Sequence, residues 1–276
     1  MIHMTTAAPT SLPFTLAGWV PPLIIAHRAN APGVSENSLA GIRANGDLGT
    51  DLVELDVRRS LDGTPFVHHD WYLSRNAAGR NVPVRVMPGR LLRRVLISDG
   101  DGEHLPRLSD ALDLIASDPT LPGPALHVKD QGGVRAALLQ IRRRRLGSRT
   151  ALWLHGRESA LLARSMVPEA LVILVEERQK TRREFSAQID AAVEVGASAV
   201  SLPWWAAVDE VLAEATAKGI GTVALIHDLD TVVSRVRAGL GGVITDHPEQ
   251  VRDILQEAGL RSVPDRVLNE EIAEAS

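Results

Sequence analysis

Short runs of hydrophobic residues alternate along the chain with longer segments whose apolar residues recur every three or four positions. The short runs are typical of strands covered on both faces, and the longer segments are typical of helices with one apolar face. The runs that predict strands are eight in number and span 23–27, 52–57, 125–129, 151–155, 171–176, 199–202, 221–226 and 242–245. This alternation favours a parallel sheet whose strands are joined by helices.

The predicted helices have recognisable faces and ends. Leu108, Leu112 and Ile115 share one side of a helix, and Gly196 follows another helix at the point where it should stop. Eight strand–helix units in about 250 residues fit one closed barrel better than two domains. The sequence therefore predicts an α/β protein with a single TIM (β/α)8 barrel over residues 18–260.

Residues 71–105 depart from this alternation. They contain prolines, glycines and an Asp-Gly-Asp-Gly run, with one short apolar stretch at 91–97. We interpret them as an insertion after the second barrel strand, placed over the barrel mouth, which acts either as a binding loop or as a surface excursion. Residues 1–17 and 261–276 are expected to form terminal tails.

Composition narrows the class of protein. The chain has 276 residues, is 45% hydrophobic, carries a formal charge of −4 and contains no cysteine. These values allow a barrel-sized core, give no electrostatic case for nucleic acid, and exclude disulfides and thiolate chemistry. Prolines interrupt the N-terminal stretch, and no run approaches the roughly 20 apolar residues that span a bilayer. We therefore expect a soluble cytoplasmic protein without stable membrane insertion, and its oligomeric state is open.

Candidate chemistry gathers at the ends of two apolar runs. His27 follows the first run, and His69 follows Pro65-Phe66-Val67. Between them, Glu54 and Asp56 project to the same face of a strand, where they repel each other unless a cation lies between them. Alone, this acidic pair would be read as solvated charges at a strand end, but imidazoles that titrate near neutral pH favour metal-assisted acid–base chemistry on a phosphate.

Several short motifs stand in a fixed order. They are His27-Arg28-Ala29, Ser35-Glu36-Asn37-Ser38, Glu54-Leu55-Asp56-Val57, Asp62-Gly63 and Val67-His68-His69-Asp70, followed by the segments 105–112 and 241–248. As an ordered set, these motifs resemble the glycerophosphodiester phosphodiesterases, a family of metal-dependent barrel enzymes that act in lipid metabolism. The resemblance extends over about residues 23–255.

The resemblance implies a reaction and roles for individual residues. A small glycerol-like phosphodiester would be hydrolysed to an alcohol and a phosphomonoester, with His27 and His69 as the acid–base pair. In the family, the attacking group is a neighbouring hydroxyl of the substrate, and water then opens the cyclic phosphate. Arg28 would hold a phosphate oxygen through its planar fork, and Lys129 would add a point charge.

The resemblance also implies a divalent metal, Mg²⁺ or Ca²⁺, held by Glu54 and Asp56. The family usually has a glutamate as the third protein ligand, at the position of His127. An imidazole ligand would remove one negative charge and shift the preference towards Mn²⁺ or Zn²⁺, although Mg²⁺ with additional waters remains open. The alternative is that His127 fills the vacated space without binding metal.

Two further residues are candidates for substrate binding. Trp204 follows the sixth strand, where it either holds an apolar or sugar-like substituent or packs in the core. His227 follows the seventh strand, where it either contacts substrate or caps the strand. His227 and Ala224 replace an asparagine and a tryptophan that the family often carries, which points to an altered substrate or to lost activity.

Three functions therefore stay open at this point. The leading one is the metal-dependent phosphodiesterase. The second is a lyase or transferase that releases the cyclic phosphate, as in the related spider-toxin phospholipases D. The third is a catalytically diverged protein that binds a phosphate ligand, although the pair of His27 and His69 argues against it because binding alone needs no acid and base.

Overall fold

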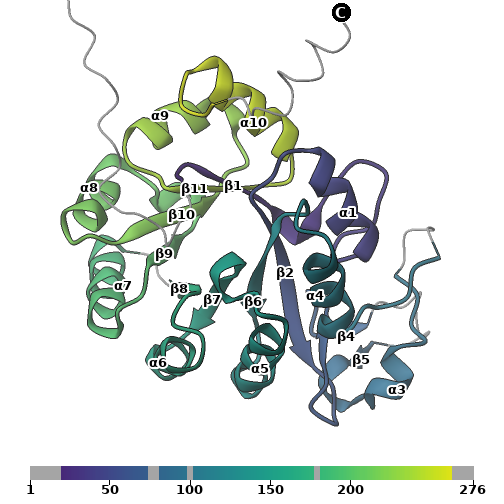
Figure 1. The fold of residues 1–276 in the computed structure, drawn as a ribbon. Coiled ribbons are helices and arrows are strands. Elements are labelled where there is room, and N and C mark those ends of the chain that lie inside the picture. Colours follow the sequence, from purple (N-terminus) through teal and green to yellow (C-terminus); the bar gives the residue numbers. More distant parts are fainter. Residues whose placement is uncertain (1–19, 74–80, 98–101, 177–180, 263–276) are drawn as a thin grey trace, which may run out of the picture.

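The protein is described by a computed structural model that covers residues 20–73, 81–97, 102–176 and 181–262. Eight parallel strands form a barrel with helices on its outside (Figure 1). The barrel strands are β1 (Leu23–Ala26), β2 (Leu52–Arg59), β6 (Gly123–Val128), β7 (Ala151–His155), β8 (Leu171–Val175), β9 (Ala199–Leu202), β10 (Gly221–Leu225) and β11 (Gly242–Thr245). Because β1 pairs with both β11 and β2, the barrel is closed. The predicted TIM (β/α)8 barrel is confirmed.

Helices cover the barrel and return the chain from the end of one strand to the start of the next. The longer ones are α1 (Leu39–Asp47), α4 (Leu108–Ser117), α5 (Val134–Arg144), α6 (Arg157–Met166), α7 (Arg182–Val195), α8 (Asp209–Ala217), α9 (Val232–Arg237) and α10 (Pro248–Glu257). Short 3-10 turns stand at η1 (His27–Ala29), η3 (Gln131–Gly133), η4 (Gly147–Arg149), η5 (Trp204–Ala206) and η6 (Leu229–Thr231). Gly196 ends α7 in the left-handed conformation expected there. None of the helices in the described ranges is long and apolar enough to cross a membrane.

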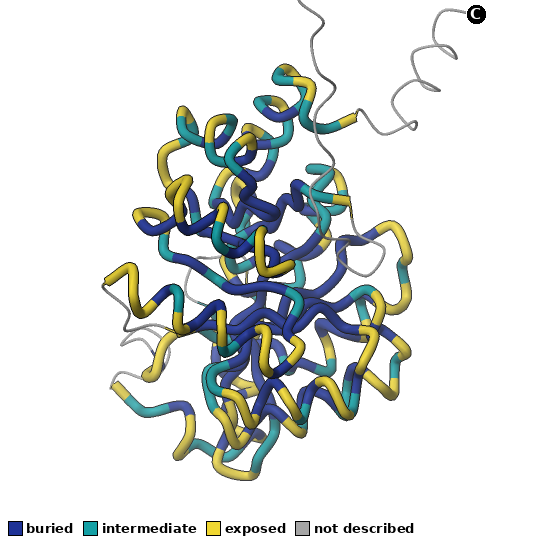
Figure 2. Tube along the Cα trace, turned by 90° about the vertical axis from the view of Figure 1, so that its left-hand side faces the viewer, coloured by how far each residue is buried: buried dark blue, intermediate teal, exposed yellow. Residues whose placement is uncertain are grey.

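Strand residues alternate between two buried layers. Leu23 and Ile25 point into the barrel interior, while Ile24 and Ala26 pack against the helices. Figure 2 shows the result, a buried centre surrounded by helices whose outer faces are exposed. This double burial explains why the barrel strands are continuous hydrophobic runs in the sequence.

The second barrel strand continues past the barrel mouth and turns back on itself. β2 ends at Arg59, and β3 (Pro65–Val67) pairs with it in the antiparallel direction. The backbone N–H of His68 then donates to the carbonyl oxygen of Asp56 at 2.8 Å. His69 therefore reaches the mouth on the returning arm of a hairpin, and not at the end of a parallel barrel strand as its apolar run suggested.

The insertion continues beyond this hairpin and lies beside β2 and α4 (Figure 1). Its elements are β4 (Tyr72–Leu73), β5 (Val82–Pro83), η2 (Val84–Val86) and α3 (Gly89–Leu92). It has a small core of its own, made by Phe66, Leu73, Val84, Leu92, Val95 and Leu105. Within the predicted insertion, residues 74–80 and 98–101 lie outside the described residues.

The predicted tail 1–17 and most of the predicted tail 261–276 also lie outside the described residues. Arg261 is described, and its two terminal nitrogens donate to the two carboxylate oxygens of Asp51, each at 2.7 Å. One of these nitrogens also donates to the carbonyl oxygen of Pro22 at 3.1 Å. Arg261 thus contacts the end of the barrel opposite the mouth.

Helix α1 packs closely against the turn that follows β1. A Cβ atom at Gly41 would overlap the carbonyl oxygen of Ala29, which belongs to the backbone and cannot rotate away. We expect Gly41→Ala to lower the free energy of unfolding by about 2 kcal/mol, measured by urea unfolding. Gly46→Ala is the control, because its Cβ would approach only a side-chain methyl of Leu121. Equal losses in both variants would contradict this account.

Candidate active site

The carboxyl ends of the barrel strands surround a cavity of about 170 Å³. One side of this cavity is polar and is lined by His27, Glu54, Asp56, His69, His127 and Lys129. The other side is mainly apolar and includes Trp153, Val175, Leu225 and Ile244. Six of the nine site residues predicted from the sequence thus meet in one cavity, at the end of the barrel where TIM barrels carry their chemistry.

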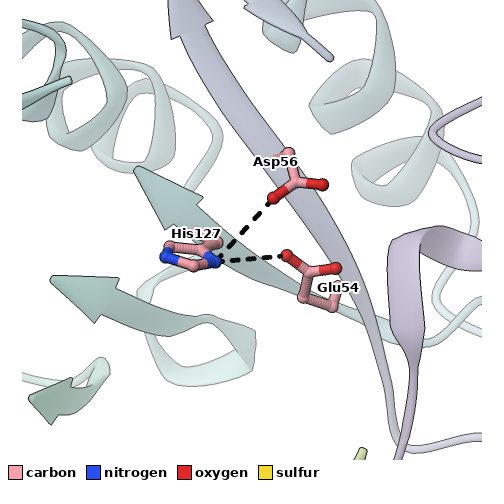
Figure 3. A group of neighbouring side chains, drawn as sticks. All are labelled: Glu54, Asp56 and His127. Carbon is pink, nitrogen blue, oxygen red and sulfur yellow. Dashed lines mark ion pairs between the residues drawn. The ribbon is translucent and has the colours of Figure 1, made fainter. Parts of the chain in front are cut away.

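Two carboxylates and an imidazole form the centre of the polar side. Glu54 and Asp56 point inward from β2, and the register of β2 with β6 places His127 beside Asp56. Nδ1 of His127 lies 3.7 Å from a carboxylate oxygen of Glu54 and 3.8 Å from one of Asp56 (Figure 3). One potential ligand atom from each residue lies within 4.8 Å of the others. This group fits a single cation bound by two oxygens and one nitrogen.

Lys129 determines which nitrogen of His127 carries the proton. Its Nζ donates to Nδ1 of His127 at 2.9 Å and lies 3.1 Å from a carboxylate oxygen of Asp56. An ammonium group only donates, so Nδ1 of His127 is the acceptor and the ring proton sits on Nε2. Burial, together with the positive charge of Lys129, lowers the pKa of His127 to about 3. His127 is therefore a neutral imidazole, the form that binds metal ions. Its single Nδ1 lone pair accepts from Lys129, so a cation held by Glu54, Asp56 and this nitrogen would replace that hydrogen bond.

His155 is a site residue that the sequence analysis missed. Its Nε2 lies 3.2 Å from Nε2 of His127, and the two rings stack with centroids 5.4 Å apart. Because His127 carries its proton on Nε2, it donates this hydrogen bond to His155. The available signal was an imidazole that closes the apolar run of β7, the same pattern that drew attention to His27.

The two carboxylates have opposite electrostatic environments. Burial and the neighbouring charge of Asp56 raise the pKa of Glu54 well above its ordinary value, although the backbone N–H of Arg28 donates to Glu54 at 2.8 Å. Burial also acts to raise the pKa of Asp56, but Lys129 and other cationic or donor groups outweigh it and hold this pKa below its usual range. The pair therefore favours fewer than two negative charges until a cation binds.

Asn37, part of the Ser-Glu-Asn-Ser motif, fixes Asp56 in place. Its Nδ2 donates to a carboxylate oxygen of Asp56 at 3.1 Å, and its Oδ1 accepts from the backbone N–H of Asp56 at 3.0 Å. Asn37 adopts a left-handed backbone with φ of 54°, and its own N–H donates to the carbonyl oxygen of Arg28 at 2.6 Å. The motif therefore joins the turn after β1 to the acidic strand.

Each of the paired histidines is oriented by an aspartate. Nδ1 of His27 lies 2.8 Å from a carboxylate oxygen of Asp246, which follows β11. Nδ1 of His69 lies 2.8 Å from a carboxylate oxygen of Asp70. A carboxylate at Nδ1 favours the proton on that nitrogen and leaves Nε2 of each ring for other partners. Asp246 thus orients the ring of His27.

Three predicted site residues do not line this cavity. The Nη1 of Arg28 donates to both carboxylate oxygens of Glu36, at 3.1 and 3.0 Å. Trp204 lies half exposed on η5, and His227 is exposed after β10. Their proposed roles in binding stay predictions. On β10, Leu225 and not Ala224 lines the cavity, because Ala224 packs against the helix layer.

The fold and this site define a TIM-barrel protein with histidines and carboxylates gathered at its mouth. Residues 27–250 match the model of the glycerophosphoryl diester phosphodiesterase family, and the chain belongs to that family. A glycerophosphodiester phosphodiesterase of Caldanaerobacter subterraneus subsp. tengcongensis is 40% identical over 57 residues, which are 21% of this chain and 24% of that protein. The matched part thus spans about a quarter of this relative's length.

Solved structures of similar proteins share the fold. A phosphodiesterase of Oleispira antarctica, in complex with the product sn-glycerol-3-phosphate, has a TM-score of 0.73 and 20% identity. The match covers 86% of this chain and 97% of that one. A glycerophosphodiester phosphodiesterase of Thermotoga maritima has a TM-score of 0.66 and 20% identity, over 84% of this chain and 97% of the other.

The balance of charge at the acidic pair predicts a stability effect. Lys129→Met leaves Asp56 buried beside Glu54 without its nearest cation, so we expect the free energy of unfolding at neutral pH to fall by about 3 kcal/mol. The pKa of Asp56 is lowered in the folded protein, so its charge stabilises above its unfolded pKa and this contribution is lost as the pH falls through its folded pKa. The difference between wild type and variant should therefore shrink in acid.

Urea unfolding of the metal-free protein at several pH values measures this difference. Lys218→Met is the matched control, because Lys218 also bonds two acidic residues, Asp190 and Glu214, but does so on the surface. Its effect should be smaller and less dependent on pH than that of Lys129→Met. An effect of Lys129→Met no larger than that of the control would refute the charge balance described above.

Proposed function

We propose that this protein is a metal-dependent phosphodiesterase that cleaves a small glycerol-like phosphodiester to an alcohol and a phosphomonoester. The observation that carries the proposal is the convergence of two aspartate-oriented histidines, His27 and His69, on a cavity with a three-residue group that fits a metal. Membership of the phosphodiesterase family supports it. So does the bound sn-glycerol-3-phosphate product in the Oleispira antarctica relative.

The residues of the cavity divide the chemistry between them. Of His27 and His69, one accepts a proton from the attacking hydroxyl, and the other donates a proton to the leaving alkoxide. In the second step the roles reverse, when water opens the cyclic phosphate. Lys129 lines the same cavity as His69 and would balance the charge of the phosphate oxygens. A bound divalent cation supplies further stabilisation of this developing negative charge.

The proposed metal site consists of Glu54, Asp56 and His127. Two carboxylates suit Mg²⁺ or Ca²⁺, whereas the Nδ1 of a neutral imidazole suits Mn²⁺ or Zn²⁺ better than Ca²⁺. His155 would act as the outer partner that orients His127, as hydrogen-bond partners of metal-binding histidines commonly do. This combination favours a transition ion over Ca²⁺.

Release of the cyclic phosphate is the second candidate function. The observation in its favour is the mainly apolar side of the cavity, where Val175, Leu225 and Ile244 offer no polar side-chain atom. Among the described residues, the hydroxyl of Ser201 and the indole N–H of Trp153 are the only polar side-chain groups that line this side, so few groups there can hold an attacking water. A slow second step would let the cyclic phosphate leave before water opens it. The cytoplasmic location expected from the sequence stays a prediction.

The acid–base roles predict the effect of removing either imidazole. His27→Ala and His69→Ala should each lower turnover by about 10²- to 10⁴-fold, because proton transfer loses one partner, while metal binding persists. The measurement is a phosphorus NMR time course with glycerophosphodiesters and each of the four metals. His104→Ala is the control, since His104 is exposed on the insertion and outside the cavity. If both variants kept the wild-type rate, the proposal would be wrong.

The same time course separates the two candidate functions. A phosphomonoester at every early time point identifies the hydrolase, and accumulation of a cyclic phosphate identifies the lyase or transferase. Binding of the phosphodiester without any turnover in the wild-type protein would instead favour the non-catalytic role.

The nitrogen ligand predicts a metal preference that substitution reverses. His127→Glu should raise the affinity for Ca²⁺ relative to Zn²⁺ by about tenfold or more, because it replaces a neutral nitrogen with an anionic oxygen. His155→Phe should weaken Zn²⁺ binding by about 10- to 100-fold while leaving all three ligands in place. Calorimetric titration with the metal alone measures both effects. An unchanged preference in His127→Glu would exclude His127 as a ligand.

A further inference from the structure

The insertion has a charge opposite to that of the rest of the chain. Between residues 71 and 97 the sequence contains six arginines and no aspartate, glutamate or lysine. Asp99, Asp101 and Glu103 follow this stretch, so the whole insertion, residues 71–105, carries +3; the chain carries −4, and the remainder therefore carries −7. A concentrated positive segment on an acidic protein indicates a surface for an anionic partner.

Four of these arginines are exposed in the structure. Arg85 belongs to η2, Arg90 belongs to α3, and Arg93 and Arg94 follow α3 directly; all four are exposed. No ion pair joins any of them to another described residue. Their charges are therefore available to a partner outside the chain.

Exposed apolar side chains lie on the same part of the chain. Twelve large hydrophobic residues are exposed in the described chain, and six of them belong to the insertion and the β2–β3 turn. These six are Leu61, Trp71, Tyr72, Val86, Leu91 and Leu96, which are between 39% and 62% exposed. Single exposed residues are ordinary, but such a concentration marks an interaction site.

Hydrogen bonds join these residues into one unit. The N–H of Leu61 donates to the carbonyl oxygen of Met87 at 2.9 Å. The N–H of Val84 donates to the carbonyl oxygen of Trp71 at 3.0 Å. The N–H of Gly89 donates to Asp62 at 3.1 Å, which ties α3 to the β2–β3 turn. The charged and apolar groups are therefore carried on a shared framework above the small core of the insertion.

This unit adjoins the candidate active site. The guanidinium of Arg58 lies 4.1 Å from the ring centre of Trp71. Both residues line a second cavity, of about 440 Å³, which shares His69 and Lys129 with the catalytic cavity. A partner bound at the insertion would thus lie next to the opening of the site.

We propose that the insertion surface, defined by Arg85, Arg90, Arg93 and Arg94 with the six exposed apolar residues, docks on an anionic lipid bilayer. Arginines attract the anionic headgroups, and each strengthens binding by about fivefold. The Trp and Tyr side chains suit the bilayer interface, and the aliphatic groups bury among the headgroups. Aliphatic groups between the arginines favour a bilayer over a nucleic acid, whose backbone offers them no apolar layer.

Docking would present the cavity to phosphodiesters held at the bilayer surface. This second part rests on the proposed phosphodiesterase function, whereas docking itself does not. The arrangement would allow the substrate to reach His69 and Lys129 from the headgroup layer through the second cavity.

Sedimentation of the full chain with lipid vesicles tests docking. We expect binding to vesicles of phosphatidylcholine mixed with phosphatidylglycerol, little binding to phosphatidylcholine alone, and weaker binding at high salt. Arg93→Ala/Arg94→Ala should weaken binding roughly 25-fold, and Leu91→Ser should weaken it without any change of charge. Circular dichroism confirms that each variant is folded.

The matched control is Arg142→Ala/Arg143→Ala. Both residues are exposed in the last turn of α5, at the end of the barrel opposite the mouth, and their removal changes the net charge equally. Unchanged vesicle binding in this control supports the proposal. An equal loss in both double variants, or binding to DNA or heparin without binding to vesicles, would overturn it.

Turnover of a water-soluble substrate, glycerophosphocholine, separates the two proposals. Arg93→Ala/Arg94→Ala should keep the wild-type rate on this substrate, because neither residue lines the catalytic cavity. If the wild-type protein turned over this substrate but did not bind vesicles, the docking proposal would be refuted and the proposed phosphodiesterase function would stand. If the wild-type protein bound vesicles but cleaved no phosphodiester, the proposed phosphodiesterase function would be refuted and the docking proposal would stand.

Discussion

The burial of two carboxylates side by side is the constraint on which the rest of the site depends. Glu54 and Asp56 lie on one strand face with almost no exposure, so their charges repel in a medium that screens them poorly. Neighbouring groups reduce this repulsion. The backbone N–H of Arg28 donates to Glu54, and Asp56 contacts the amide of Asn37 and the ammonium of Lys129. The two carboxylates and His127 together form a group that fits a cation.

The barrel supplies the geometry that this electrostatic arrangement needs. Parallel strands bring their carboxyl ends to one mouth, so residues separated by a hundred positions or more, such as His27 and Lys129, face the same cavity. The hairpin of β2 and β3 adds His69 from the side, and the last strand brings Asp246 to His27. The candidate active site is thus built from several elements, none of which contains it alone.

The imidazole of His127 changes the charge of the site, but the group of Glu54, Asp56 and His127 still fits a metal ion. Unlike a glutamate, the imidazole adds no negative charge beside Glu54 and Asp56, and it donates a hydrogen bond to His155. The acidic cavity and the arginine-rich insertion then divide the molecule into two regions of opposite charge. Our two proposals assign a cation to the first region and an anionic surface to the second, and His69 and Lys129 line the cavities of both.

The sequence by itself determined the barrel, because the period of its apolar residues is a local property that survives in the fold: all eight predicted strands form. It also determined that Glu54 and Asp56 share a face, since strand geometry requires this. Only the tertiary structure placed His155 against His127, turned Arg28 towards Glu36 and left Trp204 and His227 outside the cavity. These contacts depend on the register between strands and on which of several distant side chains bonds to each group. A local sequence pattern contains neither kind of information.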